Sequence, residues 1–251
     1  MKVTFLGTGT SVGVPTVGCG CNTCLSTDPR DNRLRTSLLL EKGEHRILID
    51  ASTDFRQQAL RIGLDRIDAI LFTHAHADHC FGLDDARPIM FRNGAIPCYA
   101  TDVTWDGLRR VYSYVFEPAP YPGVPRIVPH TIDGPFVVFS TEVEPLTVIH
   151  GLLQVTAYRI GGLAYVTDCN LIPDEACSRL EGLDTLIIDA LRFKAHPTHL
   201  CLDDSLGYIE RLKPRRALLT HISHDIKHEE TSERLPAGVE LAYDGLQLEI
   251  D

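Results

Sequence analysis

The sequence predicts an α/β fold in which two α/β halves pack around one core. Apolar strand-like segments alternate with helix-like segments, and no low-complexity linker separates two independent units. Six of the apolar segments each end on a residue type that binds metals. These residues are Asp50, His74, His150, Asp168, Asp189 and His221. Because the carboxyl ends of strands in layered α/β folds share one edge, this regularity predicts a site at that edge.

The composition is that of a globular enzyme: 251 residues, 44% of them hydrophobic, with a formal net charge of −10. The negative charge argues against binding extended nucleic acid through a basic surface, although a site holding cations still suits an anionic substrate. Met1 and Lys2 lead directly into a strand-like segment, and no apolar run approaches the roughly 18 residues of a membrane helix. We therefore expect a cytoplasmic protein without membrane contact, its eight cysteines reduced or metal-bound.

The first half of the chain contains short strands and two helices. Strands are expected at residues 3–6, 38–40, 46–50 and 69–72. Helices are expected at residues 53–62 and 82–90. Gly43 lies in the hairpin between the second and third strands, and Gly63 ends the first helix. The glycine-rich loop at residues 7–13 fits neither known phosphate-binding fingerprint, so a tight turn is favoured over a phosphate cradle.

The second half repeats the strand and helix pattern. Strands are expected at residues 146–149, 163–167, 185–188 and 217–220. Helices are expected at residues 173–180 and 203–212, with Asp203 or Asp204 capping the latter. Between the halves, prolines such as Pro118, Pro120 and Pro122 argue against a long regular element in residues 94–135. A lid over the site and an inert connector both remain open for this segment.

The stretch AILFTHAHADH at residues 69–79 is the strongest chemical signal. A short buried strand runs into a loop that carries three imidazoles and one carboxylate, namely His74, His76, Asp78 and His79. Imidazole nitrogen and carboxylate oxygen are ligands that zinc prefers, and a loop leaving a strand can fold around an ion. A solvated histidine-rich turn is the alternative, and the density of ligand-type residues argues against it.

A second metal signal lies near the start of the chain. Cys19, Cys21 and Cys24 place three thiols within six residues, which predicts three ligands of a tetrahedral zinc site that lacks its fourth member. A reduced cysteine-rich loop is the alternative. The other five cysteines are scattered and are expected to be small buried side chains.

The sequence resembles the metallo-β-lactamase superfamily along nearly its whole length, through HAHADH followed by His150, Asp168 and His221. That resemblance implies a four-layer αββα sandwich and one domain spanning residues 1–251. It implies that one metal is held by His74, His76 and His150. It implies that a second metal is held by Asp78, His79 and His221, with Asp168 bridging both. Asp50 would lie behind the ligands and fix one imidazole.

A narrower resemblance links the opening FLGTGTSVGVPTVGCGCNTC and the late THISH to the phosphodiesterase branch typified by phosphoribosyl 1,2-cyclic phosphodiesterase (PhnP-type). In that branch a structural zinc is held by the three thiols and the second histidine of THISH, here Cys19, Cys21, Cys24 and His224. His199 matches a histidine used near the leaving group, and its alternative is an exposed loop imidazole. His196 lies close by without this role, and His228 is expected to be exposed.

The resemblance implies a metal-dependent phosphodiesterase acting on small phosphodiesters, cyclic or nucleotide-like ones included. A hydroxide formed at two zinc or manganese ions would attack phosphorus, with Asp78 and His199 as catalytic residues and His199 as general acid. A tRNA 3′-processing endonuclease and a thioester or lactone hydrolase are the alternatives. The expected partner is a small phosphodiester or nucleotide-like substrate rather than extended nucleic acid, and a homodimer remains open.

Overall fold

The computed structural model describes residues 1–118 and 121–250, and this part of the chain forms two seven-stranded sheets. The first sheet has the order β14 (Gln247–Glu249), β1 (Lys2–Gly7), β2 (Ser37–Lys42), β3 (His45–Ile49), β4 (Ala69–Leu71), β5 (Ile96–Ala100), β6 (Ile127–Thr131). The second has the order β13 (Val239–Leu241), β12 (Arg216–Thr220), β11 (Thr185–Asp189), β10 (Leu163–Val166), β9 (Leu153–Ile160), β8 (Thr141–His150), β7 (Phe136–Val138).

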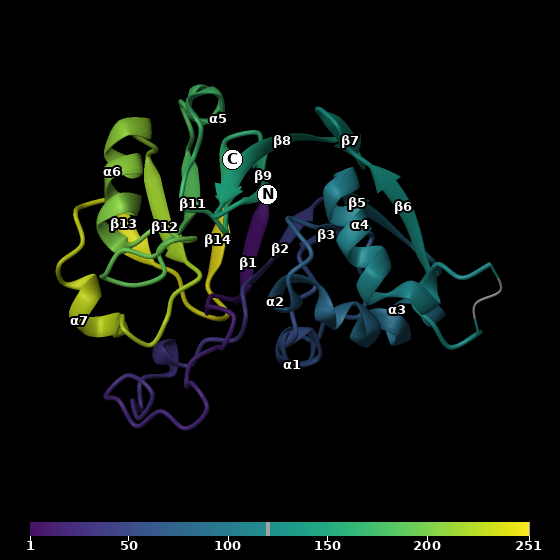
Figure 1. Cartoon of the computed structure of the whole chain (residues 1–251), viewed down its shortest axis with the longest axis horizontal. Coiled ribbons are helices and arrows are strands. Elements are labelled where there is room, and N and C mark those ends of the chain that lie inside the picture. The colour runs from purple at the N-terminus through teal and green to yellow at the C-terminus, as the bar shows by residue number, and fades with distance from the viewer. Residues whose placement is uncertain (119–120, 251) are drawn as a thin grey trace.

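Helices cover the outer face of each sheet (Figure 1). The first sheet is covered by α1 (Phe55–Ile62), α2 (Ala77–Cys80), η2 (Phe81–Ala86), α3 (Arg87–Asn93), α4 (Asp102–Val111) and η3 (Ser113–Val115). The second is covered by α5 (Asp174–Arg179), α6 (Leu202–Leu212) and α7 (His228–Ser232), while η1 (Pro29–Asp31) lies in the long loop after β1. Within the described residues, none of these helices is long and apolar enough to cross a bilayer.

Three layers of buried apolar side chains hold the four layers of the fold together. Along β2, Leu38 and Leu40 point into the space between the sheets, where they meet Tyr165 and Leu218 of the second sheet. Leu39 points the other way, toward the helices. A third apolar layer lies between the second sheet and α5 and α6. This alternation is expected of strands buried on both faces, and the predicted four-layer αββα sandwich is confirmed.

The order of parallel strands brings distant ligand-type residues to one edge. In the first sheet β3 runs parallel to β4, so Asp50 and His74 leave at the same end. In the second sheet β10, β11 and β12 are parallel, so Asp168, Asp189 and His221 also leave together. The prediction that the strand ends share an edge is therefore confirmed.

Several predicted elements differ from the observed ones in their bounds. The helix expected at 82–90 is two elements, η2 and α3, which extend to Asn93. Helix α6 starts one residue early, after Cys201, so neither Asp203 nor Asp204 is its N-cap. Asp204 instead accepts a hydrogen bond from the Cys201 backbone N–H at 3.1 Å, completing a capping box.

The expectation of no long regular element in residues 94–135 is wrong. The ten-residue helix α4 precedes the prolines, with β5 before it and β6 after it. Pro129 lies within β6, the outermost strand of its sheet, where a missing N–H donor is tolerated. Pro120 lies outside the described residues.

Candidate metal centre

The first group of candidate ligands consists of His74, His76 and His150, whose ligand atoms all lie within 4.8 Å of one another. His74 Nε2 lies 2.9 Å from His76 Nδ1. His150 donates its Nδ1–H to the backbone carbonyl of Thr198 at 2.6 Å, which leaves Nε2 with a lone pair. Burial lowers the pKa of His150, and lowers that of His74 well below its usual value. The imidazoles of His74 and His150 are thus held neutral, the form that binds metal.

The second group consists of Asp78, His79, Asp168 and His221. The Nε2 atoms of His79 and His221 lie 3.2 Å and 3.1 Å from Asp168 Oδ2. Both nitrogens lie 3.5 Å from Asp78 Oδ2. His221 Nε2 is buried and makes no hydrogen bond within the described chain. Two imidazole nitrogens and two carboxylate oxygens therefore converge on one point, a donor set that suits a divalent metal.

Charge at this second group also favours a cation. Burial alone would lower the pKa values of His79 and His221, but the carboxylates of Asp168 and Asp78 outweigh burial. The pKa of His221 rises to about 9, and that of His79 rises well above its usual range. Protons on the imidazoles thus balance the carboxylates, and a divalent cation supplies the same positive charge when it replaces them.

Asp50 lies behind the second group and contacts His79. Its Oδ2 lies 2.7 Å from His79 Nδ1 and accepts a hydrogen bond from the Thr73 hydroxyl at 2.7 Å. Its Oδ1 accepts the Thr73 backbone N–H at 2.8 Å. Asp50 and His221 both adopt left-handed backbone, with φ of 62° and 56°. Such conformations are costly outside glycine and concentrate at functional sites.

His199 lies against both groups through ring contacts. Its ring stacks on His221 with centroids 4.7 Å apart, and its edge meets His150 at 4.5 Å. His199 Nδ1 lies 2.9 Å from the fully buried carboxylate of Asp189. His196 is a neighbour at 5.2 Å whose Nδ1 accepts the Thr198 backbone N–H.

Two contacts in this region have no counterpart among the predicted site residues. Asp189 ends the apolar strand β11, and the pattern that it shares with the other strand ends is the sequence signal for it. The Thr198 carbonyl leaves no trace in residue type, because any residue offers a carbonyl.

Cys19, Cys21, Cys24 and His224 come together from opposite ends of the chain. His224 Nδ1 lies 3.2, 3.5 and 3.6 Å from the three sulfur atoms in that order. A hydrogen bond from the Cys24 backbone N–H lowers the pKa of Cys21 to about 6, which favours the thiolate that zinc binds. The five other cysteines are buried, as expected.

The loop that carries these thiols is also attached to residues 223–228 through Arg33 and Asp31. Arg33 is fully buried; it pairs with Asp31 at 3.0 Å and donates to the carbonyl of Ser223 at 3.0 Å. Asp31 also accepts the backbone N–H of His228 at 2.8 Å. The expectation that His228 is exposed is therefore wrong. Burial lowers the pKa of His228 to about 4.

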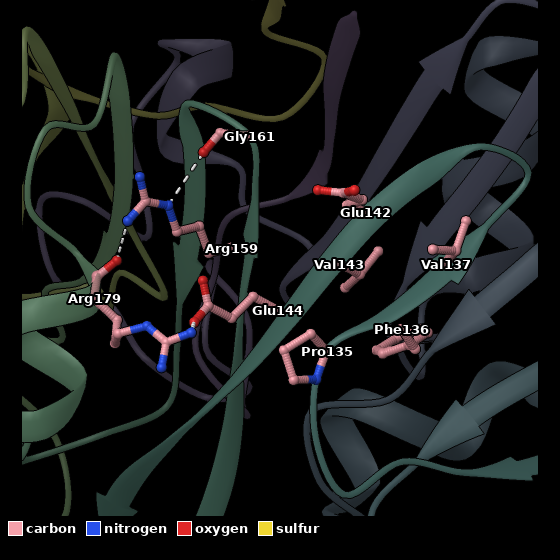
Figure 2. A pocket seen from close by; sticks show the side chains of 9 residues that line it. All are labelled: Pro135, Phe136, Val137, Glu142, Val143, Glu144, Arg159, Gly161 and Arg179. Carbon is pink, nitrogen blue, oxygen red and sulfur yellow. Dashed lines mark hydrogen bonds and ion pairs between the residues drawn. The ribbon is translucent and has the colours of Figure 1, made fainter.

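Two cavities differ in their distance from the candidate metal ligands. One of about 350 Å³ is lined by His74 and His76 together with residues of α4 and β9. Another of about 530 Å³ is lined by residues of β7, β8 and β9 and by none of the candidate ligands (Figure 2). There Arg179 pairs with Glu144, and Glu144 lies six residues before His150 on the extended strand β8, roughly 20 Å away. The smaller cavity is the one beside the candidate metal centre.

Known proteins resemble this chain in sequence and fold. Residues 45–222 match the family model described as "Beta-lactamase superfamily domain". The whole chain is 42% identical to an octanoyltransferase of Porphyromonas gingivalis, about half of whose length (52%) it spans. The crystal structure of a diphosphatase from the PhnP family superposes with a TM-score of 0.93 at 46% identity, covering 98% of this chain and 96% of that one. Zn²⁺-bound PqqB from Methylobacterium extorquens is 22% identical over the full length of both chains with a TM-score of 0.81, a likeness of fold.

Proposed function

Because this chain belongs to the β-lactamase superfamily, and within it to the PhnP family, we propose that it is a phosphodiesterase acting on small phosphodiesters. Its general class, a metal-dependent hydrolase of the metallo-β-lactamase fold, is shared with these relatives. The observation that carries the finer proposal is the His199–Asp189 pair, which presents a proton donor beside both groups of candidate ligands.

The donor sets support two metal sites, one built from imidazoles alone and the other from imidazoles and carboxylates. His74, His76 and His150 would hold one ion, and Asp78, His79 and His221 the other, with Asp168 facing both. When bound, two divalent ions generate a nucleophile from water at neutral pH and offset charge on the phosphate oxygens. Imidazole and carboxylate ligands accept zinc or manganese, whereas the thiols of Cys19, Cys21 and Cys24 with His224 favour a structural zinc.

His199 would supply the proton transfer to the leaving group, which the metals do not. The Asp189 carboxylate can only accept, so His199 Nδ1 carries a proton and the ring is held with Nε2 away from Asp189. As an imidazolium, with both ring nitrogens protonated, His199 would donate its Nε2 proton to the departing alcohol oxygen and keep its Nδ1 proton toward Asp189. An alkoxide leaves poorly without a proton, so general acid help of about 10²–10⁴-fold is expected from this residue.

The cavity beside the metals supports a small substrate. Its volume of about 350 Å³ is near the lower end of the roughly 300–1,000 Å³ typical of small-molecule sites. The net charge of −10 disfavours a long polyanion such as tRNA. A diphosphate that links two organic groups also suits the site, since each phosphorus there carries two ester-like bonds, and the PhnP-family neighbour is named a diphosphatase.

Acyl transfer is supported less well. The octanoyltransferase name belongs to a protein about twice as long as the matched region. An acyltransferase that carries the acyl group on a cysteine needs that cysteine as a thiolate, which a raised pKa disfavours. Burial raises the pKa of Cys80 to about 12 and moves that of Cys169 well above its usual range.

A substrate panel with metal-loaded protein tests the proposal. Bis-p-nitrophenyl phosphate and a diphosphate diester should be hydrolysed, with activity lost on chelation. A thioester, a lactone and a precursor tRNA should remain intact, and faster cleavage of any of these three would overturn the proposal. Elemental analysis should find about three metals per chain, and His224→Ala should lose one of them while keeping activity toward the diester.

A further inference from the structure

Two hydrogen bonds join the second sheet to the start of the metal loop, residues 72–79. The Tyr158 hydroxyl of β9 donates to the carbonyl of Phe72 at 2.7 Å, and the Thr156 backbone N–H donates to the carbonyl of Thr73 at 3.0 Å. All four residues are buried. We propose that Tyr158 is a positioning residue, which fixes the two sheets at the spacing at which their ligands share the metal ions. The inference rests on the two-metal centre of the proposed function and not on the identity of the substrate.

Each candidate metal site takes ligands from both sheets. The metal loop of the first sheet supplies one part of each ligand set, and strand ends of the second sheet supply the rest. The ligands of the first sheet are His74, His76, Asp78 and His79, and those of the second are His150, Asp168 and His221. Metal sites need ligand distances within about 0.2 Å of the ideal values. A shift of one sheet past the other would therefore disturb both sites at once.

Strand β9 can carry this contact because it lies between two strands that lead to ligands. It pairs with β8, which ends at His150, and with β10, which leads to Asp168. The register with β10 ends at Tyr158. Past that point the Thr156 backbone N–H bonds Thr73 of the first sheet instead of a neighbouring strand. The metal loop is thus held directly against the strand that orders the ligands of the second sheet.

Thr73 passes this position on to a candidate ligand of the first sheet. Its carbonyl is held by β9, while its N–H and hydroxyl both donate to Asp50, at 2.8 Å and 2.7 Å. Asp50 in turn lies 2.7 Å from His79 Nδ1. A continuous series of hydrogen bonds therefore runs from the second sheet to an imidazole supplied by the first.

The Tyr158 hydroxyl matters because the layer between the sheets is mostly apolar. Side chains such as Leu38 and Leu218 pack there through contacts that have no preferred direction. A hydrogen bond, in contrast, fixes both a distance and an angle. Stacked sheets lie about 10 Å apart, so a side chain as long as tyrosine is suited to carry a donor from one sheet to the backbone of the other. Without the hydroxyl, the buried Phe72 carbonyl loses this donor.

Tyr158→Phe removes the hydroxyl, keeps the ring and tests the role. Calorimetric titration of Mn²⁺ into protein stripped of its active-site ions should show roughly tenfold weaker binding, the lower end of the range for groups behind metal ligands. In the EPR spectrum the exchange coupling between the two Mn²⁺ ions should change, because it depends on their spacing. At saturating Mn²⁺, kcat toward bis-p-nitrophenyl phosphate should fall while KM stays nearly unchanged.

Tyr99→Phe is the matched control. It removes a hydroxyl from a tyrosine at the same layer, where the Tyr99 ring stacks on His130 and Phe136. This variant should keep the wild-type affinity, spectrum and kcat. Elemental analysis should find the proposed structural zinc in both variants, because that site lies outside the contact between β9 and the metal loop.

Urea denaturation separates positioning from an effect on stability alone. A Tyr158→Phe protein that unfolds more easily but binds Mn²⁺ with wild-type affinity and spectrum would overturn the proposed role. If the wild type binds a single active-site Mn²⁺ ion, the two-metal centre of the proposed function fails, and the affinity for that ion still decides the role of Tyr158. If two ions bind, the variant weakens them and no diester is hydrolysed, the role of Tyr158 stands and the phosphodiesterase function fails.

Discussion

The carboxylate of Asp189 lies between two imidazoles, 2.9 Å from His199 Nδ1 and 3.7 Å from His221 Nδ1. It is fully buried, and one of its oxygens also accepts the Cys169 backbone N–H at 3.2 Å. One side chain at the end of β11 thus holds the candidate general acid and faces a candidate metal ligand.

Replacing His199 should affect poor leaving groups selectively. His199→Ala should slow hydrolysis of an alkyl diester by about 10²–10⁴-fold, because an alkoxide needs a proton as it departs. Hydrolysis of a p-nitrophenyl diester should change little, since nitrophenolate is stable without one. Initial rates with the two diesters measure this. The control is His130→Ala, which removes an imidazole of β6 that stacks on Tyr99 of β5. Equal slowing of both diesters would exclude the acid role.

Replacing Asp50 should weaken metal binding at the second group. Asp50→Asn removes the charge that holds His79, and partners behind metal ligands typically contribute about 10–100-fold to metal affinity. Titration of the metal-free protein with zinc, followed by calorimetry, measures the loss. Asp54→Asn alters a nearby carboxylate that pairs with Arg35 instead of a histidine. It should retain wild-type affinity, and an unchanged affinity in Asp50→Asn would contradict the role of Asp50.

Two helix glycines should respond in opposite directions to the same change. Gly207 in α6 has open space where a Cβ would lie, so Gly207→Ala should raise the free energy of unfolding by roughly 0.4–1 kcal/mol. Gly107→Ala in α4 meets Ala75 at 2.5 Å and should lower both stability and kcat/KM, despite the better helix propensity of alanine. Urea denaturation and diester kinetics on both variants test this. A stabilised, fully active Gly107→Ala protein would show that α4 does not constrain the metal loop.

His228 should make stability depend on pH in mildly acidic solution. Burial lowers its pKa to about 4 in the folded protein, whereas an exposed histidine titrates near 6.5. Between these values the unfolded chain binds more protons, so folding stability falls as the pH drops from about 6.5 to about 4, by up to about 3 kcal/mol. Urea denaturation of wild type and His228→Gln at pH 7 and pH 5 should show the smaller pH dependence in the variant. Identical dependence in both proteins would contradict this.

The residues that meet at the site were largely predictable because they share a position in the fold. Asp50, His74, Asp168 and His221 each follow an apolar strand, and parallel strands bring such ends to one edge, so a site at that edge was predictable from pattern. The grouping of Asp168 and His221 with His79 followed from the family resemblance. His224 came from resemblance, since nothing local connects it with three cysteines about 200 residues earlier.

What could not be predicted depends on contacts between distant surfaces. The burial of His228 follows from the position of Asp31 and Arg33, which no periodicity reports. Helix α4 is hard to predict from the sequence because a run of prolines follows it in the same region. The contact of Gly107 with Ala75 leaves only a mid-helix glycine in the sequence, a residue that usually weakens a helix.

The pairing of Cys19, Cys21 and Cys24 with His224 also sets an order of events during synthesis. Ribosomes add about 5–20 residues per second, so the roughly 200 residues between them take about 10–40 s to emerge. Throughout that interval the three thiols have no fourth partner, so at the proposed structural zinc site an ion held by them alone would be exchangeable. The four-residue site is therefore completed late in translation. A nascent chain stopped before residue 224 keeps its three thiols accessible to chelators and oxidants.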